Sequence, residues 1–413
     1  MAKTLLIIGV GAEGRDGLSQ ASLDIIELAD ELWGSRRLLA MWPDFKGKTV
    51  TLGKNLNDKI QNLVTRPPGQ QIVILASGDP GFFGIAASVL KILPPEEMEI
   101  IPAVSCLQTA FARVKVPWQD AVFCGAHARP LSEVIGLVRR YAKVGILTDP
   151  QQSPAFIAQK LLAAGLADCR AVVLENLGLA DEKITDTRLT RLTDQTCGPL
   201  NVLLLLKGEG WKPAPLLSFR EDEAYRHLNG LITKKDVRLA VIGRLGLCET
   251  DTVWDIGAGS GAMSIEMAEM AWRGRVFAIE KDERNLACIR ENLAHFGITN
   301  VDIVAGTAPP ALEGLPSPDA VFIGGNSGRL AEILTAVQKS ARRGCRVAAT
   351  FAVLENMLLA LNWMLEHGWQ PLLCELRVSY GTPIAGGTRL VPQNPVYIVN
   401  GVVRPQEETC PAD

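Results

Sequence analysis

The 413-residue sequence contains no run of 18 apolar residues and no low-complexity segment. A membrane-spanning helix needs a run of about that length, and a long disordered region has a biased composition, so neither is expected. The first residues also lack the longer apolar core and small-residue cleavage site of a secretory signal peptide. We therefore expect a soluble, cytoplasmic protein with no membrane partner.

Paired cysteines are also missing. The nine cysteines are odd in number, are scattered through apolar segments and form no C-x-x-C pair. This pattern is typical of buried free thiols in a reducing compartment. The sequence also shows no spacing of ligands that is typical of a metal site, so we expect no catalytic metal.

The chain has little net charge and lacks the motifs of covalent catalysis. Its formal charge is −3, and no stripe of basic and aromatic residues is present. A general attraction to nucleic acid is therefore not expected. Because there is no Ser-His-Asp arrangement and no G-x-S-x-G motif, acyl transfer through a serine nucleophile is not expected either.

The length and the 47% hydrophobic content predict two globular domains, because one ordinary core does not reach 413 residues. Apolar runs and helix-like stretches alternate in both halves, which is typical of the α/β class. A segment rich in glycine and proline begins at Gly208 and marks a linker. We predict a first domain over 1–207, a linker over 208–229, a second domain over 230–403 and a disordered tail over 404–413.

In the first domain, apolar runs predict strands, and helix-like stretches lie between them. The strands are expected at Thr4–Val10, Gln71–Leu75, Val144–Leu147, Ala171–Leu174 and Val202–Leu206, and one of the helices at Ser153–Ala164. In the second domain we expect strands at Thr252–Ile256, Arg275–Ile279, Val301–Ala305, Ala320–Ile323 and Arg346–Thr350, with helices at 234–245, 282–296, 329–341 and 353–367, and a β-rich end.

A glycine turn in the second half indicates a nucleotide-like cofactor. The segment Asp255-Ile-Gly257-Ala-Gly259-Ser-Gly261 lies between an expected strand and an expected helix, and Glu280 ends the next strand. Glycines allow a ligand to approach the backbone, and a carboxylate at the second position can accept both ribose hydroxyls. The acidic-x-G-x-G-x-G pattern resembles that of the Rossmann-like (class I) S-adenosylmethionine methyltransferases.

A second glycine turn, Gly9-Val-Gly11-Ala-Glu-Gly14, satisfies G-x-G-x-x-G after the first strand. In a dinucleotide site the helix would open at the turn, whereas here the segment Arg15–Leu18 delays it to about Ser19. The context therefore disfavours NAD(P). A dehydrogenase or a non-catalytic scaffold remains an alternative for the first half.

Two further loops of the first half follow expected strands: Gly78-Asp79-Pro80-Gly81 and Ser105-Cys106. They resemble the signature loops of the tetrapyrrole methylase family, which implies a two-lobed (class III) fold that holds S-adenosylmethionine between its lobes. The sequence departs from that family at Gly125-Ala-His127-Ala128-Arg129, where a serine-leucine-histidine-glycine-arginine segment is usual, and at Cys106, where serine is frequent. Additional matches are Trp118–Ala121, Leu147–Asp149, Glu175–Gly178 and Pro199–Val202.

The order of the two halves resembles the two-domain, decarboxylating corrin-ring methyltransferases of cobalamin biosynthesis that act on precorrin-6Y, over about residues 3–403. The resemblance implies methylation of carbon 5 by the first domain and of carbon 15 by the second, with decarboxylation of the carbon-12 acetate to give precorrin-8. It also implies two S-adenosylmethionine sites per chain, a small-molecule corrin substrate and a homo-oligomer. A cobalt-containing precorrin and, at a greater remove, an RNA methyltransferase remain alternatives.

The resemblance assigns most of the candidate site residues. The cofactor-binding candidates are Gly9, Gly11, Gly78, Asp79, Pro80, Ser105, Cys106, Thr233, Asp255, Gly257, Ala258, Gly259, Ser260, Gly261, Glu280, Gly306 and Ala308. The catalytic residues stay open, with Asp79, His127, Arg129 and Lys234 as candidates. Each has a plain structural alternative: a turn cap for Asp79, a surface pair for His127 and Arg129, and a solvated helix face for Lys234.

Methyl transfer from a sulfonium needs alignment more than a covalent nucleophile, and proximity supplies up to roughly 7–11 kcal/mol. The absence of a nucleophile motif agrees with this chemistry. Amine methyltransferases carry an Asn/Asp-Pro-Pro-aromatic loop after the fourth strand, whereas this sequence has the glycine-rich segment Gly324–Gly328 there. Such a loop leaves room for a broad, flat ring.

Overall fold

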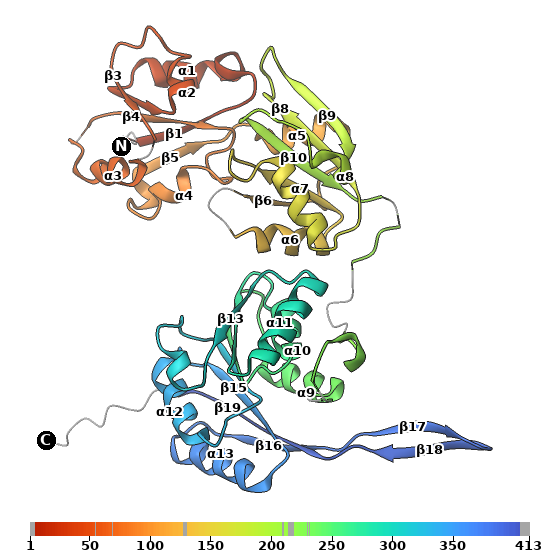
Figure 1. Cartoon of the computed structure of the whole chain (residues 1–413). Helices are drawn as coiled ribbons and strands as arrows, with labels where there is room; N and C mark the ends of the chain where they lie inside the picture. Colours follow the sequence, from red (N-terminus) through yellow and green to blue (C-terminus); the bar gives the residue numbers. More distant parts are fainter. Residues whose placement is uncertain are drawn as a thin grey trace, which may run out of the picture. The chain divides into compact units, whose positions relative to one another are not determined.

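The computed structural model describes residues 5–53, 55–67, 69–126, 130–208, 210–213, 219–228, 230 and 232–404. It divides into two compact units, the first made of Met1–Leu162 and Ala167–Lys212 and the second chiefly of Pro213–Asp413 (Figure 1). Both units are α/β, as the sequence predicts. Within the described part of the chain, no helix is long and apolar enough to cross a membrane.

The first lobe of the first unit is built on a five-stranded parallel sheet with the order β3-β2-β4-β1-β5. Every residue of β1 is buried, because helices cover both faces of the sheet, and this explains its continuous apolar run. The strands are β1 (Leu5–Val10), β2 (Glu31–Gly34), β3 (Lys48–Thr51), β4 (Ile72–Ser77) and β5 (Met98–Ile101). The helices are α1 (Gln20–Glu27), α2 (Arg36–Leu39), α3 (Leu56–Gln61) and α4 (Ala86–Val89).

The second lobe carries a mixed sheet with the order β6-β7-β10-β8-β9, in which only β6 and β7 are parallel. The strands are β6 (Val122–Gly125), β7 (Lys143–Leu147), β8 (Arg170–Glu175), β9 (Lys183–Arg188) and β10 (Asn201–Leu206). The helices are α5 (Cys106–Val114), α6 (Leu131–Arg140), α7 (Pro154–Ala163) and α8 (Leu189–Leu192). Figure 1 shows this lobe, in yellow and green, beside the first, in red and orange.

The two lobes touch at a glycine. Gly178, at φ +78°, lies so close to Ala12 that an added Cβ would be 2.3 Å from the Ala12 carbonyl oxygen. Any other residue here would push the second lobe away from the first glycine turn.

The second unit is built on a seven-stranded sheet with the order β13-β12-β11-β14-β15-β19-β16. The first five strands are parallel, β19 is antiparallel to β15, and β16 is antiparallel to β19. The strands are β11 (Thr252–Ile256), β12 (Arg275–Glu280), β13 (Val301–Ala305), β14 (Ala320–Ile323), β15 (Arg346–Phe351), β16 (Leu372–Leu376) and β19 (Val396–Val402). The helices are α9 (Lys235–Leu245), α10 (Ala262–Met270), α11 (Glu283–Phe296), α12 (Leu330–Ser340) and α13 (Leu354–Glu366). The observed bounds of β11 to β15 and of α9, α11, α12 and α13 agree with the predicted ones to within about one residue.

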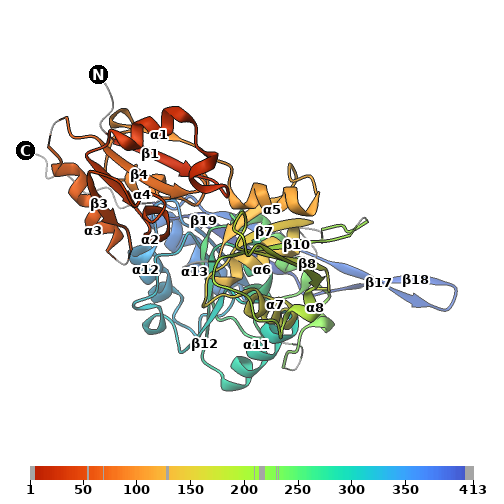
Figure 2. The same ribbon diagram turned by 90° about the horizontal axis from the view of Figure 1, so that it is seen from above.

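A two-stranded hairpin interrupts the chain between β16 and β19. Its strands, β17 (Ser379–Ile384) and β18 (Gly387–Pro392), pair only with each other within the described residues, and nearly all of their residues are exposed. Both views show the hairpin extending away from the rest of the second unit (Figures 1 and 2). The sequence predicts a β-rich end but not this projection.

Residues 219–228, which we call the strap, fall inside the predicted linker but pack on the second unit. Tyr225 is buried, and the Arg226 backbone N–H donates to Asn292 Oδ1 of α11 at 2.8 Å. Most of the predicted tail, 405–413, lies outside the described residues, but Arg404 is held by a 2.6 Å hydrogen bond to Gln370 Oε1.

Candidate functional sites

The first unit has a cavity of about 210 Å³ between its lobes. It opens where β1 and β4 of the first lobe end and faces the end of β7 and the start of β10 in the second lobe. Its walls are mostly apolar, with Ser77, Cys106, Thr148, Asn201 and Arg37 as side chains that can form polar contacts. Of the cofactor candidates in this unit, Gly11, Gly78 and Cys106 line the cavity.

The other first-unit candidates, Gly9, Asp79, Pro80 and Ser105, do not line this cavity. A Cβ on Gly9 would lie 2.4 Å from the Gly78 carbonyl oxygen, so the two glycine loops pack backbone to backbone. Asp79 accepts a 2.8 Å hydrogen bond from the Gly81 N–H, the turn cap that was its structural alternative, and Pro80 is buried beside it. Ser105 is buried at the N-cap of α5, in a capping box with Gln108.

The second unit has a cavity of about 200 Å³ at the carboxyl ends of β11, β12, β13 and β14. Ligands of open parallel sheets bind at this edge. The predicted residues Gly257, Glu280, Gly306 and Ala308 line it. Asn326 and Ser327 line it too and belong to the glycine-rich segment Gly324–Gly328, whereas Lys281 lines it and was not predicted; Lys281 Nζ donates to Ser327 Oγ at 2.9 Å.

The backbone of the glycine turn has a shape that requires glycine. Gly257, Gly259 and Gly261 have φ angles of +75°, +55° and +80°, which side chains with a Cβ rarely adopt. A Cβ on Gly257 would lie 2.6 Å from the Gly325 backbone nitrogen. Gly261 is the N-cap of α10, so the unpaired N–H groups of that helix begin at the turn.

Glu280 is fixed by the backbone around it. Oε2 accepts from the Gly259 N–H at 2.8 Å, and Oε1 accepts from the N–H groups of Lys281 and Asp282 at 2.8 and 2.9 Å. A carboxylate has about four acceptor positions, so Oε2 keeps one that is not used by these bonds. A rigid carboxylate with spare acceptor capacity beside a glycine turn fits the ribose of an adenosine cofactor.

Asp255 and Ser260 lie beneath this cavity. Asp255 is completely buried, and one of its oxygens accepts from the Ser264 hydroxyl while the other, Oδ1, has no hydrogen-bond partner. Burial, aided by the charge of Glu280, raises the pKa of Asp255 to about 7. The Ser260 carbonyl accepts from Asn292 Nδ2 at 2.9 Å, and the same amide group binds the Arg226 carbonyl at 2.8 Å. Asn292 thus joins the strap to the glycine turn.

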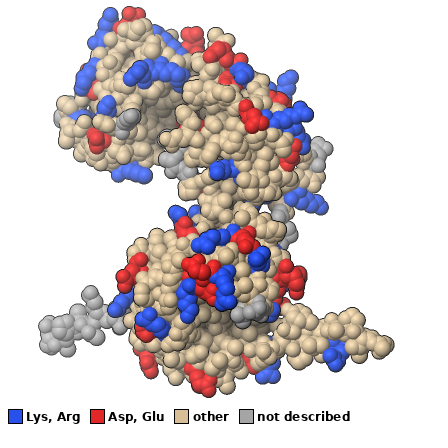
Figure 3. Space-filling model, viewed as in Figure 1, with Lys and Arg blue, Asp and Glu red and all other residues tan. Residues whose placement is uncertain are grey.

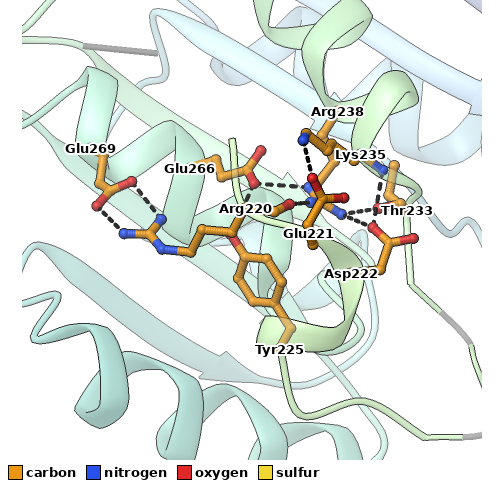
Figure 4. Close-up of polar contacts among 9 residues, drawn as sticks. All are labelled: Arg220, Glu221, Asp222, Tyr225, Thr233, Lys235, Arg238, Glu266 and Glu269. Atoms are coloured by element: carbon orange, nitrogen blue, oxygen red, sulfur yellow. Dashed lines mark hydrogen bonds and ion pairs between the residues drawn. The ribbon is translucent and has the colours of Figure 1, made fainter. Parts of the chain in front are cut away.

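Thr233 belongs to a charged network at the start of α9 (Figure 4), and Lys234 lies beside it. Its centre is Arg238, whose side chain is fully buried and donates to Glu266 Oε1 at 2.9 Å, to Asp222 Oδ1 at 2.7 Å and to the Thr233 carbonyl at 2.6 Å. Lys234 Nζ lies 3.3 Å from Asp222 Oδ2. The carboxylates that face this basic cluster therefore belong to the protein, which accounts for the cluster without a ligand.

Two candidates cannot be placed. His127 and Arg129 lie outside the described residues, together with Ala128. Among the residues that the structure does describe, no group of three or more His, Cys, Asp or Glu is arranged to hold a metal ion.

The two folds define the class of the protein. The strand order of the second unit, with its glycine turn and acidic residue, is that of a Rossmann-like methyltransferase, and the first unit has the two-lobed arrangement expected of a tetrapyrrole methylase. Family models agree: residues 4–193 match the tetrapyrrole (corrin/porphyrin) methylases, and residues 223–402 match the precorrin methyltransferase domain.

The chain belongs to the precorrin-6Y C(5,15)-methyltransferase (decarboxylating) family. It is 31% identical over 395 residues to the protein of that name from a Sinorhizobium species, which covers 95% of this chain and 94% of that protein. It is thus an S-adenosylmethionine-dependent, decarboxylating methyltransferase.

Two shorter relatives each match less than half of this chain. A cobalt-precorrin-7 C(5)-methyltransferase from Salmonella typhimurium is 33% identical over 180 residues, 44% of this chain and 88% of that protein. A probable cobalt-precorrin-6B C(15)-methyltransferase (decarboxylating) from Sulfurisphaera tokodaii is 32% identical over 172 residues, 41% of this chain and 89% of that protein.

Proposed function

We propose that the first unit methylates carbon 5 of a precorrin-6Y-type ring, and that the second methylates carbon 15 and removes the carboxylate of the carbon-12 acetate, giving precorrin-8. The observation that carries this proposal is the pair of separate cavities, one in each unit, at glycine turns that follow buried parallel strands. The two shorter relatives support it, because each is named for one of the two reactions and matches a stretch about as long as one unit.

Each cavity would hold one S-adenosylmethionine, which supplies an electrophilic methyl group. In the second unit, Glu280 would hold the ribose, and the glycine turn would let the remainder of the cofactor approach the backbone. In the first unit, Gly11 and Gly78 would have the second role. Fixed carboxylate and glycine positions align donor and acceptor, and this alignment is the protein's main contribution to methyl transfer.

The substrate is proposed to be a small corrin precursor. A ring that already contains cobalt remains the alternative substrate. The face in Figure 3 shows acidic and basic side chains side by side on the second unit, without the continuous basic surface that would favour RNA.

We also propose that the protein is a homo-oligomer. The hairpin β17–β18 leaves both outer edges unpaired, and edges of this kind pair with another chain. It exposes Leu390, Ile384 and Tyr380 by 68%, 52% and 46%, and Arg389 is its one charged residue. Figure 3 shows the projection as mostly tan, that is, uncharged.

The division of labour is tested by disabling each cavity separately and analysing the products by mass spectrometry. Replacing Glu280 by Ala removes charge-assisted hydrogen bonds of roughly 1.5–3 kcal/mol, so cofactor binding in the second unit should weaken by about one to two orders of magnitude. Methylation at carbon 15 and loss of carbon dioxide should then fall together. Carbon-5 methylation should persist when the product of the other unit, precorrin-7, is supplied.

A Gly78→Ala/Asp79→Ala variant should show the opposite pattern: carbon-5 methylation falls, while carbon-15 methylation and decarboxylation persist. The reason is that alanine is strained in the left-handed backbone conformation of Gly78. Glu283→Ala is the matched control for Glu280→Ala, since Glu283 is an exposed carboxylate three residues away that does not line the cavity. If Glu280→Ala abolished carbon-5 methylation of supplied precorrin-7 and left decarboxylation intact, the assignment of the two units would be reversed.

A further inference from the structure

The cavity of the first unit has one charged side chain among the lining residues that the structure describes, Arg37 of α2. Its Nη2 donates to Ser77 Oγ, at the end of β4, over 2.7 Å. Within the described part of the chain, its guanidinium makes no other hydrogen bond and pairs with no carboxylate. By contrast, Arg113 and Arg170 of the same unit are each bound to a carboxylate.

Local structure fixes where this cation lies. The Ser35 hydroxyl caps α2 by accepting from the Leu38 N–H at 3.3 Å, and Leu38 is buried in the core of the lobe. Strand β2 pairs in parallel with β4, with Trp33 opposite Ile74, so the helix that follows β2 begins beside the end of β4. Arg37 therefore reaches the cavity from an anchored turn.

The two side chains have the donors that a carboxylate needs. A guanidinium has five N–H donors in a planar fork, and here only the Nη2 group of Arg37 donates, to Ser77 Oγ. Ser77 accepts with its oxygen, which leaves its hydroxyl proton to donate. Arginine binds carboxylates through two parallel hydrogen bonds, which gives direction as well as affinity.

The rest of the cavity makes this donor pair selective. Val104, Leu200 and Leu179 line it and are exposed by 56%, 45% and 37%, so its rim is apolar. An apolar rim with one unpaired cation fits a ligand that has a broad apolar part and a carboxylate. We propose that Arg37 and Ser77 form a carboxylate-binding subsite of the first unit.

Two sources can supply that carboxylate: an acetate or propionate arm of the ring, or the methionine part of the cofactor. The first source depends on the proposed function of this unit. Both sources are tested on the full chain. Arg37→Gln and Ser77→Ala each remove one side chain of the subsite, and Arg37→Lys keeps the positive charge but loses the planar guanidinium. Arg36→Gln is the matched control. Arg36 is on the same helix, is exposed, and does not line the cavity.

Calorimetry with S-adenosylhomocysteine and with 5′-methylthioadenosine, which lacks the carboxylate, separates the sources. If the cofactor carboxylate is bound, Arg37→Gln weakens S-adenosylhomocysteine binding at one site about tenfold or more and leaves 5′-methylthioadenosine unaffected. If a ring arm is bound, cofactor affinity is unchanged and the KM for precorrin-7 in carbon-5 methylation rises about tenfold or more with kcat retained. In both cases Arg37→Lys is intermediate and Arg36→Gln is equal to wild type.

If the wild-type first unit binds cofactor and precorrin-7, and Arg37→Gln matches Arg36→Gln in every measurement, the subsite is refuted while the proposed function stands. If the wild-type first unit binds no cofactor, both the proposed function and the subsite are refuted.

Discussion

Asp255 shows how one residue can link the cofactor turn to pH. Its carboxyl is completely buried below the turn, accepts a hydrogen bond from the Ser264 hydroxyl, and has a pKa that burial raises to about 7. An unfolded aspartate has a pKa of about 3.9, so between about pH 4 and pH 7 the folded protein retains a proton that the unfolded chain has lost. The contribution of this group to stability therefore decreases as pH rises through that range and is constant above it.

We expect Asp255→Asn, which cannot ionise, to remove this dependence. Relative to wild type, the variant should gain roughly 1.4 kcal/mol for each pH unit between pH 5 and about pH 7. Calorimetric unfolding of both proteins at pH 5, 6, 7 and 8 measures the difference. Asp282→Asn is the control, because the hydrogen bond from Arg284 lowers the pKa of the half-buried Asp282 to about 2 and its ionisation is constant over this range. A difference between Asp255→Asn and wild type that does not vary with pH would contradict the expected titration.

Among the elements, the hairpin β17–β18 forms a two-stranded sheet of its own, and nearly all of its residues are exposed. A two-stranded ribbon without a covered face is marginally stable in water. Near its base, the Tyr380 hydroxyl donates to Asp236 of α9, and this hydrogen bond raises the pKa of Tyr380 to about 12. The remainder has no partner in the described part of the chain, which is consistent with the proposed contact between subunits.

Replacing both Ile384 and Leu390 by Ser should lower the molar mass in solution to that of a smaller assembly, measured by light scattering after size-exclusion chromatography. Leu365→Ser is the matched control, because this leucine of α13 is exposed by 58% and lies outside the hairpin. Cofactor affinity should not change in either variant. A wild-type monomer, or an unchanged mass in the double variant, would show that the hairpin does not join subunits.

The elements also show how far the sequence could be interpreted. Strands such as Thr252–Ile256 and Val301–Ala305 were predicted with their observed bounds, because buried parallel strands have continuous apolar runs. The glycine turn and Glu280 were found from the same local pattern, and the structure brings Gly257 and Glu280 to one cavity. Which candidates bind the cofactor stays a prediction.

Other features depend on distant contacts. Arg37 and Ser77 are 40 residues apart and meet only because β2 pairs with β4. Asn292 joins the strap to Ser260 across three segments, and no spacing in the sequence indicates it. Polar and apolar residues alternate only weakly along the exposed hairpin. The sequence therefore does not distinguish its strands from strands of the main sheet.

At the scale of the whole molecule, the boundary between the units lies before the strap. Arg238 is fully buried, and its partners Asp222 and the Arg220 carbonyl are both on the strap. In a fragment without the strap, this buried guanidinium would lose two of its hydrogen-bond partners. The loss would lower the free energy of unfolding by several kcal/mol.

We therefore expect fragments 1–207 and 219–404 to fold and to bind one S-adenosylhomocysteine each, and the intact chain to bind two. A fragment over 230–404 should aggregate or bind poorly. Calorimetry of freshly purified, ligand-free proteins gives the stoichiometries, and circular dichroism shows whether each fragment is folded. A single site in the intact chain, or equal stability of the two C-terminal fragments, would contradict these expectations.

The contact between Gly257 and Gly325 has a consequence for inheritance. Every amino acid change at codon 257, whether by one nucleotide substitution or more, adds at least a Cβ. That atom would lie 2.6 Å from the backbone nitrogen of Gly325, which no side-chain substitution can remove. The codon therefore tolerates only synonymous change as long as the turn keeps its shape. In a population of organisms that depends on this enzyme, missense alleles at this codon should be absent even where neighbouring surface codons vary freely.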